Sequence, residues 1–172
     1  MSDPEKLIAS VVAFAGGEIV GRVRLQKEVY LLDQLGLKSG FSYSYHHYGP
    51  YSADLVDAVD GAKAFRLVEE QTRHRKSDGV PFSVYCKGSA LDAALSELGG
   101  MSSVEVERLL GIMQGRSATV LELAATIHWL RTKEGLRDWR PELVRRKGIK
   151  TEGGRIEEAL QLLRTLALHS EH

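Results

Sequence analysis

The sequence predicts an α+β protein that is mostly helical: a modified winged helix-turn-helix at residues 1–88, with a β-hairpin as its wing, then a helical region at 89–172. Three observations predict it. Apolar residues recur at helical spacing through most of the chain, one aromatic stretch alternates with polar residues, and two strand-like segments flank a glycine turn. The resulting order, helix, short strand, helix, strand, helix, hairpin, is that of a winged helix with an added strand. We expect the helical region to pack on the winged helix and to share its core.

The first two helices have recognisable ends. Asp3 is predicted to be an N-cap with Pro4 at the first helical position, and Gly16-Gly17 stops this helix. Residues 18–21 form a short extended link. The second helix follows directly, and Gly36 is placed as the glycine just beyond its end.

The stretch FSYSYHH has a period of two, which predicts a strand with one aromatic face. That face holds Phe41, Tyr43, Tyr45 and His47. Gly49-Pro50 is expected to end the strand, since Pro fixes φ and donates no hydrogen bond. Ser52 is then the predicted N-cap of the third helix.

The remaining elements follow from turn and capping signals. Residues 66–74 and 80–87 flank a turn that contains Gly79, which predicts the hairpin. Beyond residue 88 we expect only helices, beginning with a short one at 90–100. Ser102, Ser117 and Asp138 are predicted to start three of them, and Thr151 precedes the closing helix.

Composition limits the classes of function. Lys+Arg and Asp+Glu both number 23, and this zero net charge weighs against a protein that coats nucleic acid. The single cysteine, Cys86, cannot form an internal disulfide, which favours the cytoplasm. We see no signal peptide and no apolar run long enough to span a membrane.

Signals of catalysis are missing from the sequence. It has no GxSxG, HExxH, P-loop or GxGxxG motif. His46 and His47 are neighbours on a predicted strand and point to opposite faces, so they do not suit one metal ion. We therefore expect no enzymatic activity, no cofactor and no metal.

Two surfaces are candidates for binding a protein partner. Arg24 and Lys27 share one side of the second helix, where they form either a solvated face or a site for an acidic partner. The third helix carries an acidic stripe, which phosphates would repel and a basic protein would attract. The candidate residues are Arg24, Lys27, His46, Asp54, Asp57 and Asp60.

The alternative is a nucleic-acid-binding winged-helix protein. It would use the tip of the wing and the segment from 131 to 150. This segment contains eight Lys and Arg, only three acidic residues, and Trp139. The competing interpretation is a solvated helix whose Trp139 packs inward. The residues of this alternative are Arg73, Arg75, Lys76, Arg140, Arg145, Arg146 and Lys147.

Two segments also carry a family resemblance. GEIVGRVRLQKEVYLLDQLG followed by HHYGPYSADLVDAV resembles the YwgA-like family of bacterial and archaeal proteins, over about residues 16 to 70. It is more distantly similar to the Panacea domain of SocA-type antitoxins. The resemblance implies a non-enzymatic, regulatory or antitoxin-like module that binds another protein. Homodimerisation through the C-terminal helices is a further expectation.

Overall fold

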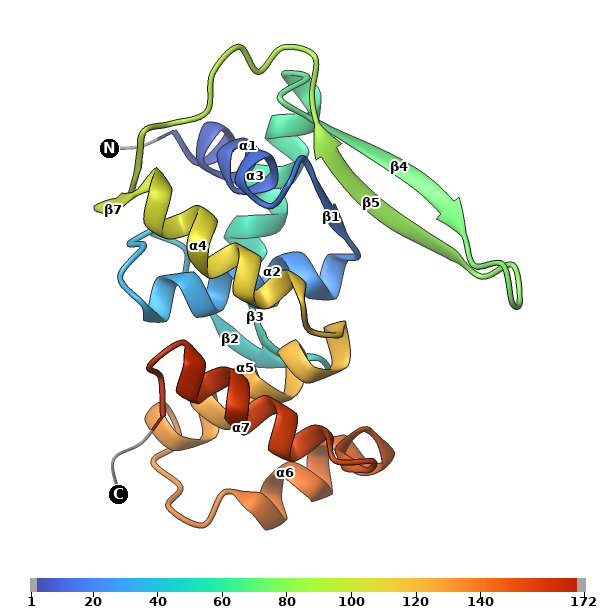
Figure 1. Cartoon of the computed structure of the whole chain (residues 1–172), viewed down its shortest axis with the longest axis vertical. Coiled ribbons are helices and arrows are strands. Elements are labelled where there is room, and N and C mark those ends of the chain that lie inside the picture. Colours follow the sequence, from blue (N-terminus) through green and yellow to red (C-terminus); the bar gives the residue numbers. More distant parts are fainter. Residues whose placement is uncertain (1–2, 170–172) are drawn as a thin grey trace.

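The computed structural model describes residues 3–169 of the chain (Figure 1). The helices are α1 (Pro4–Phe14), α2 (Arg22–Gln34), α3 (Ala53–Ala64), α4 (Ser103–Gln114), α5 (Ala118–Thr132), α6 (Arg140–Lys147), the 3-10 helix η1 (Gly148–Thr151) and α7 (Arg155–Thr165). The strands are β1 (Glu18–Val20), β2 (Ser44–His46), β3 (Gly49–Tyr51), β4 (Val68–His74), β5 (Pro81–Lys87), β6 (Glu97–Leu98) and β7 (Met101–Ser102). The predicted α+β, mostly helical class is confirmed.

Capping side chains start several helices as predicted. Asp3 accepts hydrogen bonds from the backbone of α1, and Ser52 accepts one at the start of α3. Ser102 and Ser117 do the same for α4 and α5. The prediction of Asp138 as a cap was wrong, because the residue before α6 is Trp139 and no side chain caps that helix.

The predicted hairpin forms an arm that projects from the body of the protein (Figure 1). β4 and β5 pair antiparallel over their full length, from Val68 opposite Lys87 to His74 opposite Pro81. β1 adds to the other edge of β5 near the base of the arm, giving the order β1-β5-β4. The arm is therefore anchored at one end only.

The aromatic stretch forms a second, smaller hairpin. Its residues alternate between half-buried and exposed up to His46, as the period of two predicts. Gly49-Pro50 does not end the sheet, however: it begins β3, which pairs back on β2 with His46 opposite Gly49. His47 lies in the connecting turn and is exposed, so it does not join the aromatic face.

The expected short helix at 90–100 is absent from the described chain. β6 and β7 form a small hairpin there, joined by Gly99-Gly100. Gly99 has φ +53, and a Cβ on it would overlap the backbone carbonyl of Leu37. This close approach of two backbones overrides the apolar pattern that predicts a helix.

The centre of the molecule is α5. Every residue from Val120 to His128 is buried, so the helix is enclosed on all sides. α2 and β3 pack on it from the N-terminal half, and α6 and α7 pack on it from the C-terminal half. A single cluster of buried side chains includes residues of both halves.

Candidate functional site

A cleft of about 440 Å³ opens beside α2 and α3, near the base of the β4–β5 arm. Its floor is apolar, and three tyrosines, three cations and two carboxylates complete it. Its lining residues are Arg22, Val23, Leu25, Gln26, Lys27, Tyr48, Tyr51, Leu55, Val56, Val59, Asp60, Lys63, Glu70 and Tyr85. The volume lies within the roughly 300–1,000 Å³ that small-molecule sites occupy.

Glu70 is the best-connected polar group of this cleft. Lys63 Nζ donates a hydrogen bond to its Oε2 at 3.0 Å, and Arg22 Nη2 lies 3.6 Å from its Oε1. Burial alone raises the pKa of Glu70, but the hydrogen bond and charge of Lys63, aided by Tyr85 and Arg22, bring it below its usual value. At neutral pH the cleft therefore contains an ionised carboxylate.

Tyr85 lies beside this carboxylate and keeps its proton. Its ring is buried, and burial followed by the negative charge of Glu70 raises the pKa of the hydroxyl to about 12. A neutral phenol and an ionised carboxylate thus lie next to each other on β5 and β4. The pair provides one hydrogen-bond donor and one acceptor at physiological pH.

Two of the cleft's tyrosines, Tyr48 and Tyr51, belong to an aromatic turn, residues 46–51, made by the end of β2, the connecting turn and β3. Tyr48 is 48% exposed, and the ring of His47 packs edge-on against it at 4.8 Å. His46 lies across Tyr51 at 4.4 Å between ring centroids. The turn therefore presents aromatic rings to solvent as well as to the cleft.

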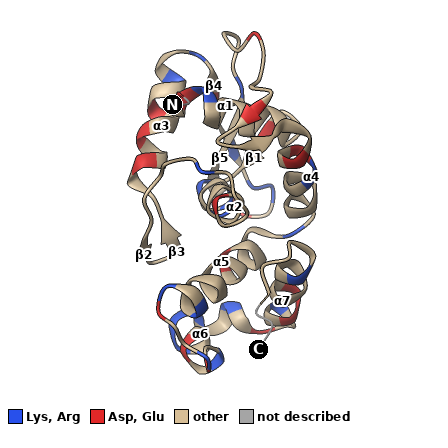
Figure 2. Cartoon of the chain, turned by 90° about the vertical axis from the view of Figure 1, so that its left-hand side faces the viewer, with Lys and Arg blue, Asp and Glu red and all other residues tan. Residues whose placement is uncertain are grey.

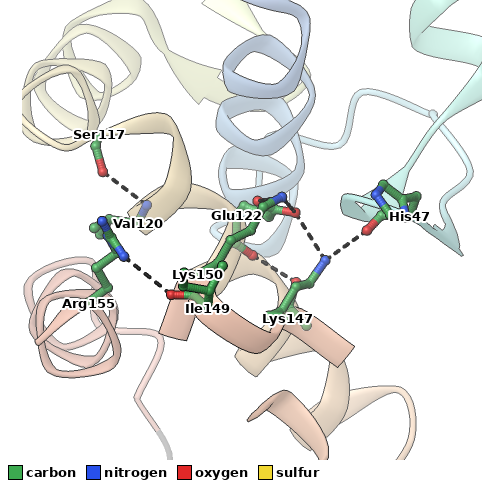
Figure 3. A network of polar contacts seen from close by, with 9 residues as sticks. His47, Ser117, Val120, Glu122, Lys147, Ile149, Lys150 and Arg155 are labelled. Atoms are coloured by element: carbon green, nitrogen blue, oxygen red, sulfur yellow. Dashed lines mark hydrogen bonds and ion pairs between the residues drawn. The ribbon is translucent and has the colours of Figure 1, made fainter. Parts of the chain in front are cut away.

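Three lysines contact the aromatic turn. We call Lys27, Lys147 and Lys150 the lysine cluster. Lys147 Nζ donates to the backbone oxygen of His47 at 3.0 Å and to Glu122 Oε1 at 3.1 Å (Figure 3). Lys150 Nζ lies 2.9 Å from Glu122 Oε2 and 4.7 Å from the ring centre of Tyr48. Glu122 is buried and is the only carboxylate paired with the cluster among the residues described.

Lys27 completes the cluster from α2. Its Nζ donates to the backbone oxygen of Pro50 at 2.5 Å, and its side chain is almost wholly buried. Burial lowers the pKa of Lys27 to about 8, against the attraction of Glu122 and with the repulsion of Lys147 and Lys150. Its neighbour Gln26 holds the backbone of Ser52 by two hydrogen bonds of 2.9 Å each.

The residues predicted to bind a protein partner fall in three places. Arg24 and Lys27 are inside the fold, because Arg24 donates to Glu28 and to two backbone oxygens at the end of α4. His46 is exposed on the aromatic turn. Asp54, Asp57 and Asp60 are exposed on α3, where Figure 2 shows the acidic residues. Asp60 also lines the cleft, and Asp54 accepts a hydrogen bond from the Ser42 backbone.

The residues of the nucleic-acid alternative are mostly neutralised by carboxylates. On the arm, Arg73 pairs with Glu18 and Arg75 with Asp78. On α6, Arg145 and Arg146 share Glu142, while Arg140 reaches Glu157. Lys147 is buried in the lysine cluster, and Lys76 at the tip of the arm is exposed. Trp139 packs inward, as the competing interpretation of this segment expects.

Four residues of the cleft and the lysine cluster were not predicted from the sequence as site residues: Glu70, Tyr85, Glu122 and Lys150. These residues come from four separate elements, and no short motif links them. One signal was present: Glu122 is a lone acid in an otherwise apolar helix, and such a residue needs a cationic partner when the helix is buried. Within residues 3–169 no group of His, Cys, Asp and Glu could hold a metal ion, and no helix is long and apolar enough to cross a membrane.

Two curated proteins are similar to this chain, and no protein-family model matches it. The uncharacterised protein YwgA of Bacillus subtilis is 25% identical over 122 residues, which cover 71% of this chain and 70% of YwgA. The resemblance to the YwgA-like family is confirmed. The more distant similarity to the Panacea domain stays a prediction.

The second relative overturns one expectation. DNA ADP-ribosyl glycohydrolase of Thermus aquaticus is 29% identical over 126 residues, which cover 72% of this chain and 34% of that protein. The chain thus spans about a third of the glycohydrolase. The expectation of no enzymatic activity, which was based on missing motifs, was wrong. A relative of this chain is a hydrolase, and none of those motifs represents its chemistry. Neither relative supports an antitoxin or regulatory role.

Proposed function

We propose that the chain acts on ADP-ribosylated DNA, and that the cleft beside α2 and α3 receives the modified nucleotide. The observation that carries the proposal is the similarity to DNA ADP-ribosyl glycohydrolase over 72% of the chain. The lining of the cleft is consistent with it: tyrosine rings suit a base or adenine ring, and cations suit phosphates.

The chemistry assigned to the cleft is hydrolysis of the glycosidic bond that joins ADP-ribose to DNA. Such reactions use carboxylates as acid, base or nucleophile around a cationic sugar. Glu70 is ionised at neutral pH, so it accepts a proton from the attacking water as the water oxygen bonds to the sugar carbon, and that proton then passes to the DNA atom released when the glycosidic bond breaks. Asp60 is the second carboxylate of the cleft.

The test uses a single-stranded oligonucleotide that carries ADP-ribose, with release of ADP-ribose followed by chromatography. We expect the wild-type chain to release it and Glu70→Gln to slow release at least about 100-fold, the usual effect of losing a general base. Glu69→Gln is the matched control, because Glu69 is the neighbouring residue of β4 and is exposed. Binding of the modified strand without release would assign the chain a binding role. If the chain neither binds the strand nor releases ADP-ribose, the proposal is refuted.

A second candidate, binding of a basic protein, rests on the outer side of α3. Asp57 is exposed there, and so is the ring of Phe65 at the end of α3, which is 67% exposed. Loss of a co-purifying protein on Asp57→Lys, which leaves the cleft residue Asp60 unchanged, would favour this candidate. An unchanged set of co-purifying proteins would argue against it.

A further inference from the structure

The lysine cluster contains more positive charge than the protein neutralises. Glu122 forms ion pairs with Lys147 and Lys150 and attracts Lys27 only at longer range, so three ammonium groups have one carboxylate among them. Lys27 and Lys147 are buried, and each donates to a backbone oxygen of the aromatic turn. Buried charges are normally paired, so the buried ammonium of Lys27, which forms no ion pair among the described residues, favours an anion that binds above it.

The surface above this charge is aromatic. His46, His47 and Tyr48 are exposed, and Tyr51 is half-buried beside them. Lys150 connects the surface to the cluster, because its ammonium lies against the ring of Tyr48 while its side chain remains 35% exposed. An anion with flat aromatic groups satisfies both features at once, whereas an acidic peptide would use only the charge.

We propose that the aromatic turn and Lys150 bind a single strand of DNA, with bases stacked on Tyr48 and its neighbours and phosphates held over the lysine cluster. The inference rests on the proposed function, since Tyr48 also lines the cleft and the strand would continue from the nucleotide held there. Stacking on side chains requires unpaired bases, so the turn selects a single strand over a duplex.

The experiment measures the fluorescence anisotropy of a labelled oligothymidylate of about 12 nucleotides that carries no ADP-ribose. This probe is titrated with the full chain at several salt concentrations. We expect Lys150→Gln to weaken binding and to reduce the slope of log affinity against log salt by about 0.7, the value for one phosphate contact on a single strand. Tyr48→Leu should weaken binding about 5- to 100-fold, and Tyr48→Phe, which keeps the ring, should bind as the wild type does.

Lys87→Gln is the matched control for charge. Lys87 is exposed at the end of β5, away from the aromatic turn, so this variant should bind the strand as tightly as the wild type. Circular dichroism of each variant checks that the fold is kept.

Three results would overturn the inference: no binding by the wild type at low salt, equal affinity for a duplex of the same length, or equal effects of Lys150→Gln and Lys87→Gln. Because the probe contains no ADP-ribose, strand binding and glycohydrolase activity are separate readouts. Release of ADP-ribose without binding of this probe would leave the proposed function standing and remove only the assignment of the turn.

Discussion

Glu28 and His128 are both buried, and burial favours the neutral form of each. Burial raises the pKa of Glu28 to about 7, although Arg24 and Gln114 counteract it. Burial, followed by the nearby charges of Lys133 and Arg131, lowers the pKa of His128 to about 4. The two residues therefore give the stability of the fold opposite dependences on pH.

The signs follow from which state binds the proton. Between pH 7 and pH 5 the folded chain protonates Glu28 while the unfolded chain does not, so this residue adds stability as the pH falls. Over the same range the unfolded chain protonates His128 while the folded chain does not, so His128 removes stability as the pH falls. Each effect is about 2 kcal/mol at pH 5, and the two largely cancel in the wild type.

Single variants should reveal the dependence of stability on pH that each residue contributes. We expect Glu28→Gln to lose about 2 kcal/mol of stability from pH 7 to pH 5, and His128→Asn to gain about as much. Urea unfolding at pH 5, 6 and 7 measures both. A wild-type slope that persists unchanged in both variants would show that neither residue is responsible.

At the scale of elements, the β2–β3 hairpin packs directly on α5 through a glycine. Gly49 has φ +93, and a Cβ on it would lie 2.6 Å from Thr126 Oγ1. Thr126 is buried and donates to the backbone oxygen of Glu122, so it has little room to move. The hairpin and helix can approach this closely only where a side chain is absent.

Gly49→Ala should therefore destabilise the protein by about 2–4 kcal/mol, the sum of a backbone cost and a steric cost. Gly17→Ala is the matched control, because Gly17 has φ +92 and nothing within 4 Å of an added Cβ. It pays the backbone cost of about 1–2 kcal/mol alone. If thermal unfolding gives the same loss for both variants, the contact with Thr126 is not restrictive.

The elements also show what sequence patterns can predict. Caps such as Ser52 and Ser117 are local signals, and they were found because the side chain acts on the backbone three residues away. Glu122 and Lys150 act across 28 residues, and Lys147 reaches His47 across 100. The position of Glu122 in a buried helix indicates that it needs a cation, but nothing local identifies Lys147 and Lys150 as its partners. The β4–β5 hairpin was predicted because its turn is a local signal, whereas the cleft and the lysine cluster were not.

At the scale of the whole molecule, the N-terminal residues lack a complete core without the C-terminal helices. Leu31 and Leu32 of α2 and Tyr30 are fully buried in the cluster that includes α5. Tyr30 also bonds His128 Nδ1 at 2.9 Å. Removing residues 89–169 would expose the side of α2 that packs on α4 and α5.

We therefore expect a fragment of residues 1–88 to remain unfolded or to aggregate, although it contains α1 to α3 and the whole β4–β5 arm. Circular dichroism and thermal unfolding of the fragment measure this, with the full chain as reference. A cooperative unfolding transition in the soluble fragment would contradict the expectation and define 1–88 as an independent domain.

The lysine cluster links a segment that is synthesised early with residues that are synthesised much later. The aromatic turn leaves the ribosome early, whereas Lys147 and Lys150, which support it, are made about a hundred residues later. Until then, the carbonyl of His47 and the ring of Tyr48 lack these partners. A chain that ends before α6 and η1 cannot present the finished turn, so the protein acquires this surface only when these two helices are in place.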